Sequence, residues 1–204
     1  MMHLIAAYQI AKAYSIDRKT EMLAGALAPD AVSSKDTTHY YIGNHEDYSR
    51  TMDLQRFVTD HKEELSSPFW LGYYSHLIAD QIWLQGFYFA WLRNRMKNDP
   101  QFYTVYHEDF RLLNGKLLKH FGLKEELEAS LKAFCSFPEI SEMNKADFSS
   151  FLDSALEDLH YSQEDLNAPL QVFTMPQIIG YICTSVDKSL VLMNRLSGLE
   201  GGRL

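Results

Sequence analysis

One segment, residues 68–97, constrains the fold more than any other part of the chain. It contains "LGYYSHLIADQIWLQGFYFAW" (71–91), which carries no Lys or Arg and has apolar side chains in every turn. A helix that is apolar on all sides belongs in a protein interior. Pro68 stands near its start, where a proline is tolerated. The segment therefore predicts a long central helix against which other helices pack.

Helical periodicity also dominates the rest of the sequence, and no stretch alternates with a period of two for long enough to require a sheet. We expect a polar loop at 29–47, a connection at 136–150, and helices at 2–14, 18–28, 47–64, 68–97, 101–121, 123–135, 147–160 and 174–197. This pattern predicts an all-α fold. We expect a single-domain multi-helix bundle over residues 1–198, followed by a flexible tail at 199–204.

Composition and charge exclude several classes of protein. The chain has 204 residues, 46% of them apolar, which suffices for one domain with a substantial core. Its net charge of −8 argues against a long nucleic acid or an anionic membrane surface as the main partner. A small phosphorylated ligand is not excluded, because a bound dication can invert the local charge. No apolar run approaches the roughly 20 residues of a transmembrane helix.

Cysteine content and the N-terminal residues bear on the cellular compartment. Cys135 and Cys183 are isolated and lack CxxC spacing, so they predict neither a disulfide framework nor a thiolate metal site. The first residues lack the basic start and small-residue cleavage site of a signal peptide. We therefore expect a cytoplasmic protein.

The central helix carries a histidine and a carboxylate among its aromatic residues. At 100° per residue, an arc of about 100° contains Phe69, Gly72, Tyr73, His76, Asp80, Trp83 and Phe87. A buried carboxylate costs several kcal/mol unless it is paired or bound to a metal. His76 and Asp80 lie one turn apart, at about 6 Å, which one or two metal ions can bridge. A structural His–Asp hydrogen bond in the core is the alternative.

Four further residues are candidate ligands, although each also has an ordinary explanation. His3 lies on the apolar stripe of the first helix, where a histidine often simply packs. Asp30 follows the stop signal "GALAP", where an Asp often forms a turn. His39 and His45 lie in the polar loop, where histidines are commonly solvated.

The order of His3, "GALAPD", a loop histidine and "LGYYSHLIAD" resembles the zinc-dependent phospholipase C family, whose helical architecture is shared with single-strand-specific zinc nucleases. The resemblance covers about the first 95 residues and implies a helical bundle of that type. It also implies that His3, Asp30, His39, His76 and Asp80 are metal ligands, with Asp80 bridging two ions. We prefer His39 over His45 because its distance from Asp30 is closer to that in the family.

The function implied by the resemblance is a metal-dependent hydrolase, in which a metal-activated water attacks a phosphodiester or phosphomonoester. Asp30 and Asp80 would be its catalytic residues. One or two zinc ions suit the ligand set, and Mn or Fe would fit nearly as well. The expected substrate is a small phosphorylated molecule or a lipid headgroup. Its candidate contacts are Tyr40, Tyr41, Phe69, Tyr73 and Trp83, although aromatic residues at helical spacing more often belong to a core than to a substrate pocket. Lys35 and Arg50 are candidate phosphate contacts and are equally plausible as solvated surface charges.

The sequence also departs from the family and leaves an alternative open. Gly86 stands where the family has a histidine, and the only His-x-x-x-Glu pair, His160 and Glu164, lies far downstream. We therefore expect at most two metals. A catalytically inactive helical binding or scaffold protein that retains the fold is the alternative. An HD-domain phosphohydrolase is disfavoured because it needs adjacent His and Asp, and both candidate sites read His-Glu-Asp (45–47 and 107–109).

Overall fold

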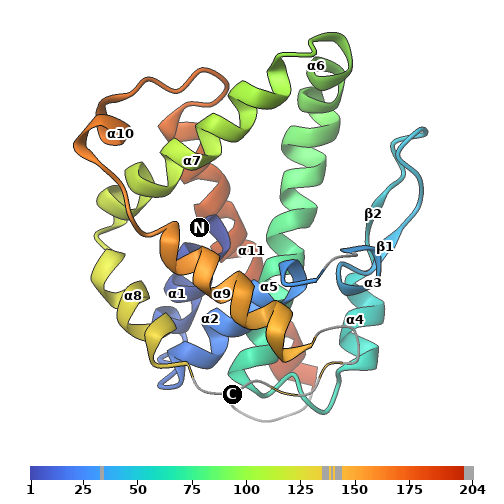
Figure 1. The fold of residues 1–204 in the computed structure, drawn as a ribbon. Helices are drawn as coiled ribbons and strands as arrows, with labels where there is room; N and C mark the ends of the chain where they lie inside the picture. Colours follow the sequence, from blue (N-terminus) through green and yellow to red (C-terminus); the bar gives the residue numbers. More distant parts are fainter. Residues whose placement is uncertain (33–34, 135–137, 139, 141–143, 200–204) are drawn as a thin grey trace.

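The computed structural model describes residues 1–32, 35–134, 138, 140 and 144–199. Helices account for nearly all the regular structure of these residues, which confirms the predicted all-α class (Figure 1). The elements are α1 (Met2–Ala13), α2 (Lys19–Leu27), η1 (Ala28–Asp30), α3 (Lys35–Thr38), β1 (Tyr41–Ile42), β2 (Thr51–Met52), α4 (Leu54–Asp60), α5 (Pro68–Trp83), η2 (Leu84–Leu92), α6 (Arg93–Asn98), α7 (Phe102–Phe121), α8 (Lys124–Lys132), α9 (Lys145–Glu157), α10 (Gln163–Asn167) and α11 (Met175–Leu199).

The predicted central helix is present and runs without a break from Pro68 to Asn98 as α5, η2 and α6 (Figure 1). Its middle part, η2, has the wider hydrogen-bond pattern of a π-helix, a geometry that is frequent near functional sites. The first part, α5, is buried around almost its whole circumference. It contacts α1, α2 and α11, so the core forms around the segment that carries His76 and Asp80.

Helices α2 and α5 approach each other with their backbones in contact, because each has a glycine at the crossing. A methyl group added at Gly25 would lie 1.8 Å from the carbonyl oxygen of Phe69. One added at Gly72 would lie 2.0 Å from the carbonyl oxygen of Met22. No real Cβ comes that close to backbone. The two glycines therefore set the distance between the end of α2 and the first half of α5.

A buried carboxylate on α7 binds the backbone of the segment that precedes α11. Asp109 on α7 is fully buried and accepts hydrogen bonds from the backbone N–H groups of Gln171, Val172 and Phe173, at 2.7–3.2 Å. These bonds satisfy its charge and place Phe173 in the core ahead of α11. Helix α11 then packs against α1 and α5.

The prediction of a helix at 47–64 is wrong for the first half of that range. Residues 41–42 and 51–52 pair as an antiparallel hairpin, with Tyr41 opposite Met52, and α4 covers only 54–60. Asp53 fixes that start because its side chain accepts a hydrogen bond from the N–H of Arg56. The hairpin loop depends on the positive φ of Gly43 and Tyr48. Strands of two residues are too short to show a period of two.

Smaller differences concern the predicted loops and helix ends. The loop predicted at 29–47 contains the end of η1 and all of α3. The helix predicted at 147–160 is α9, which begins earlier because Asn144 caps it. The unpredicted α10 begins at a capping box of Ser162 and Asp165. Cys135, part of the predicted connection and residues 200–204 of the predicted tail lie outside the described residues, whereas Leu199 ends α11. None of the described helices combines the length and apolar character needed to cross a membrane.

The glycine crossing generates a stability prediction. Gly72→Ala should lower the free energy of unfolding by at least about 2 kcal/mol, because the new methyl group must push α2 away. Gly86→Ala is the matched control: it lies in the same long helix, but a Cβ there would meet nothing within 4 Å. Alanine at that site should be neutral or stabilising by up to about 1 kcal/mol. Urea denaturation of both variants measures the difference. Equal effects at the two positions would contradict the close crossing.

Candidate metal centre

His76 is oriented by the end of α2. Its Nδ1 lies 2.8 Å from the carbonyl oxygen of Ala26, one of the last carbonyls of α2, which lack an intrahelical partner. A carbonyl can only accept, so Nδ1 donates and the Nε2 of the neutral ring keeps its lone pair. Because His76 is 1% exposed, that lone pair faces the protein interior. Such a backbone hydrogen bond is typical behind a metal-binding histidine.

His39 follows α3 and is oriented in the same way. Its Nδ1 lies 3.1 Å from the carbonyl oxygen of Lys35, so its Nε2 is also the free nitrogen when the ring is neutral. Thr38 ties this turn to η1 by donating from Oγ1 to the carbonyl oxygen of Pro29 at 3.0 Å. The Nε2 atoms of His39 and His76 are 3.3 Å apart. Two lone pairs at that distance repel unless a positive charge lies between or beside them.

The two carboxylates close the cluster. Asp80 places Oδ1 3.2 Å from His3 Nε2, and places Oδ2 3.3 Å from His39 Nε2 and 3.5 Å from His76 Nε2. Asp30 Oδ1 is 3.5 Å from His39 Nε2. Potential ligand atoms within 4.8 Å of one another form two groups: His3, His76 and Asp80, and Asp30, His39 and His76. Asp80 thus divides its oxygens between His3 and His39, as a bridging carboxylate would.

His3 joins the cluster from α1. Its ring stacks on that of His76, with centroids 3.9 Å apart and planes inclined by 14°. Burial lowers the pKa of His3, and the nearby His76 lowers it further, which favours the neutral, ligand-competent ring. His3 Nδ1 is buried and has no hydrogen-bond partner in the described part of the chain. Asp80 and Asp30 remain about one-fifth exposed, so small molecules can reach the carboxylates.

The pKa shifts of Asp80 and His39 follow from the attraction between the buried carboxylates and the histidines around them. Burial alone would raise the pKa of Asp80, but His76 and the hydrogen bonds from His3 and His39 hold it well below its usual range. Burial alone would lower the pKa of His39, but its hydrogen bonds to Asp30 and Asp80 raise it to about 9. Without a metal, a proton on His39 compensates the carboxylates. The same donor set fits one or two dications such as zinc.

The alternative loop histidine, His45, lies elsewhere. Its ring packs against Tyr88 and Phe89 of η2, at centroid distances of 5.8 and 5.9 Å. The structure therefore brings together His3, Asp30, His39, His76 and Asp80, the residues selected from the sequence, and separates His45 from them. Whether these residues bind a metal stays a prediction.

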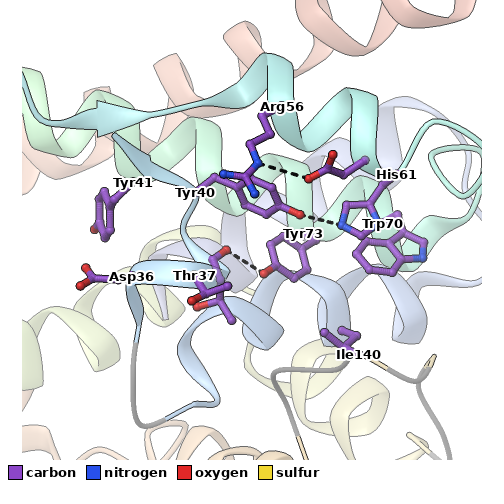
Figure 2. A pocket seen from close by; sticks show the side chains of 11 residues that line it. Asp36, Thr37, Tyr40, Tyr41, Arg56, His61, Trp70, Tyr73 and Ile140 are labelled. Atoms are coloured by element: carbon purple, nitrogen blue, oxygen red, sulfur yellow. Dashed lines mark hydrogen bonds and ion pairs between the residues drawn. The ribbon is translucent and has the colours of Figure 1, made fainter. Parts of the chain in front are cut away.

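The predicted aromatic contacts divide into two groups. Tyr40, Tyr41 and Tyr73 line a cavity of about 500 Å³, where the Tyr73 hydroxyl donates to the carbonyl oxygen of Thr38 at 2.7 Å (Figure 2). Trp83 does not line it. Its ring instead packs against Phe87, Phe110, Phe173 and Tyr181. Ten residues extend about 15 Å along a helix axis, so Trp83 does not share this cavity with Tyr73. Its contact with a substrate stays a prediction.

Other side chains around the centre also have defined positions. Phe69 is 1% exposed and belongs to the core. Lys35 pairs with Asp30, and Arg50 pairs with Asp36. A second hollow, of about 260 Å³, opens at Asp30 and is otherwise lined by Ala31, Val32 and the α9 residues Asp147, Ser150, Phe151 and Ser154. His160 and Glu164 belong to the C-terminal half, where His160 Nδ1 contacts the carbonyl oxygen of Glu157.

Sequence reasoning missed the supporting groups. The carbonyls of Ala26 and Lys35 carry no side-chain signal, although the first could be suspected because α2 ends at Leu27. Gln81, beside Asp80, was also missed. It donates to Thr51 Oγ1 and the carbonyl oxygen of Met52, at 3.3 and 3.4 Å, and accepts from Lys188 at 2.9 Å.

Comparison with known proteins identifies no relative: no family model, curated protein or solved structure matches the chain. The bundle type and the chemistry inferred from the phospholipase C resemblance therefore stay predictions, argued from the geometry above.

The two loop histidines give a direct test of the centre. His39→Ala should abolish or strongly reduce zinc binding, because it removes a nitrogen close to both carboxylates. His45→Ala should leave zinc binding unchanged. Equilibrium dialysis against zinc, followed by mass-spectrometric metal analysis, measures both, and circular dichroism checks that each variant is folded. Equal zinc content in folded His39→Ala and wild-type protein would remove His39 from the centre.

Proposed function

We propose that the chain is a metal-dependent hydrolase of phosphoric esters, with His3, Asp30, His39, His76 and Asp80 holding one or two zinc ions. The observation that carries the proposal is the convergence of three imidazoles and two carboxylates, with the Nε2 atoms of His39 and His76 only 3.3 Å apart. Buried carboxylates are either paired or bound to a metal, and this ligand set suits a metal. Manganese or iron would suit the same ligands nearly as well.

The zinc ions would lower the pKa of a water molecule and neutralise charge on phosphoryl oxygens. The protein's contribution is to hold its ligands in fixed orientations. His76 and His39 are locked by backbone carbonyls, and the stacking of His3 on His76 restricts both rings. Asp30 is partly exposed and pairs with Lys35. It would be the second carboxylate of the proposed centre, while Asp80 lies between His3 and His39.

The phosphoester part of the proposal rests on the order of the ligands along the chain, which resembles the zinc-dependent phospholipase C family. A bundle of that type is part of the same proposal. Lys35 and Arg50, both close to the cluster, add the positive charge that an anionic substrate needs. The substrate would be a small phosphorylated molecule or a lipid headgroup, bound beside the partly exposed carboxylates of Asp30 and Asp80.

The test is metal content and hydrolysis measured on the same samples. Wild-type protein, purified without chelator or histidine tag, should contain one or two equivalents of zinc, manganese or iron and should hydrolyse bis(4-nitrophenyl) phosphate or 4-nitrophenyl phosphate. Asp80→Ala should lose the metal and at least about a hundredfold in rate, more than is usual for residues behind the ligands. Asp187→Ala, at an exposed helical position on α11, should change neither.

Each other outcome has a defined meaning. Metal that is lost in Asp80→Ala, without hydrolysis of any phosphoester offered, would favour the inactive binding or scaffold protein over the hydrolase. Absence of metal from folded wild-type protein, even after zinc is supplied, would reject the centre itself.

A further inference from the structure

Tyr41 lies beside the cluster and is not one of its proposed ligands. Its ring is nearly parallel to that of His39, with centroids 5.4 Å apart and planes inclined by 10°. The guanidinium carbon of Arg50 lies 4.0 Å from the centroid of the same ring, the geometry of a cation–π contact. Tyr41 thus contacts a candidate ligand and a cation at once.

The hydroxyl of Tyr41 is an available hydrogen-bond donor. The side chain is only partly buried, and its hydroxyl makes no hydrogen bond to another described residue, unlike those of Tyr40 and Tyr73. A phenol hydroxyl can donate one hydrogen bond to a ligand oxygen.

Arg50 is held close to the ring and retains donor capacity. Its side chain is 19% exposed and forms an ion pair with Asp36. Its Nε is buried and has no hydrogen-bond partner in the described part of the chain. A guanidinium group with an unused N–H suits an anionic ligand. It also places positive charge over the Tyr41 ring.

The hairpin that carries Tyr41 is attached to the helix that carries Asp80. Tyr41 on β1 pairs with Met52 on β2, and Gln81 donates to the carbonyl oxygen of Met52. Lys188 on α11 in turn donates to Gln81. Tyr41 also lines the cavity of about 500 Å³, so solvent reaches its side chain (Figure 2).

We propose that the hydroxyl of Tyr41 donates a hydrogen bond to a phosphoryl oxygen of the substrate, with Arg50 holding the ring in place. This inference rests on the proposed phosphoesterase function and gives one of its candidate substrate contacts a defined role. A neutral O–H donor is suited to this place, because it binds a phosphoryl oxygen without competing with the metal for the carboxylates.

The chain offers a matched control on the same hairpin. Tyr48 also lies under an arginine, with the guanidinium carbon of Arg93 4.5 Å from its ring centroid. Its ring packs against Phe89 of η2 and not against any residue of the cluster. Tyr48→Phe therefore removes a hydroxyl from an equivalent cation–π pair away from the centre.

The experiment is calorimetric titration of inorganic phosphate into zinc-loaded wild-type, Tyr41→Phe and Tyr48→Phe proteins, with metal content measured on each sample. All three should hold the same amount of zinc. Tyr41→Phe should bind phosphate about tenfold more weakly, the effect of losing one hydrogen bond to a charged group. Tyr48→Phe should bind phosphate like the wild type. The rate of bis(4-nitrophenyl) phosphate hydrolysis should fall in Tyr41→Phe alone.

The possible failures are distinguishable. Zinc binding by all three proteins with equal phosphate affinity would overturn the role of Tyr41 and leave the metal centre intact. The role would also be overturned if zinc-loaded wild type failed to bind phosphate, or if Tyr41→Phe lost its zinc. Absence of zinc from wild-type protein would overturn the proposed function and this inference with it.

Discussion

The backbone contact between α2 and α5 is the constraint on which the rest of the structure depends. Gly25 and Gly72 let the two helices touch without side chains between them. Only at that separation can the carbonyl of Ala26 reach the ring of His76, at 2.8 Å. Asp30 ends η1, which follows directly after α2, so the position of α2 also fixes that of Asp30. Packing and chemistry are therefore joined at one crossing, and a single methyl group there would disturb both.

The electrostatics of the cluster follow from this packing. The Nδ1 atoms of His39 and His76 donate to backbone carbonyls, so both Nε2 atoms point toward Asp80. The centre then holds more hydrogen-bond acceptors than protons. A proton on His39 relieves this partly, which is why its pKa is raised to about 9. A dication relieves it more fully, because it interacts with several acceptors at once.

Much of the fold could be predicted from the sequence, because long helices repeat their apolar residues over several turns. The continuous helix from Pro68 to Asn98 is the clearest example. The β1–β2 hairpin could not be predicted, because it depends on positive φ angles in its loop and on pairing between two very short strands. Helix α10 could not be predicted either, because it is short and depends on a single capping box. The five clustered residues could be selected from their order along the chain. Trp83 shows the limit, because sharing a helix face with Tyr73 does not place it in the same pocket.

The fold holds the candidate metal ligands on core helices more rigidly than it holds Tyr41 on the hairpin. His3, His76 and Asp80 lie on core helices, and His76 is locked by a backbone carbonyl. Tyr41 instead lies on a strand of two residues, which Gln81 holds to α5 through side-chain hydrogen bonds of 3.3–3.4 Å. Regions with few buried contacts open at lower free energy than the core. The ligands would therefore keep their geometry while the wall carrying Tyr41 adjusts to the molecule bound against it.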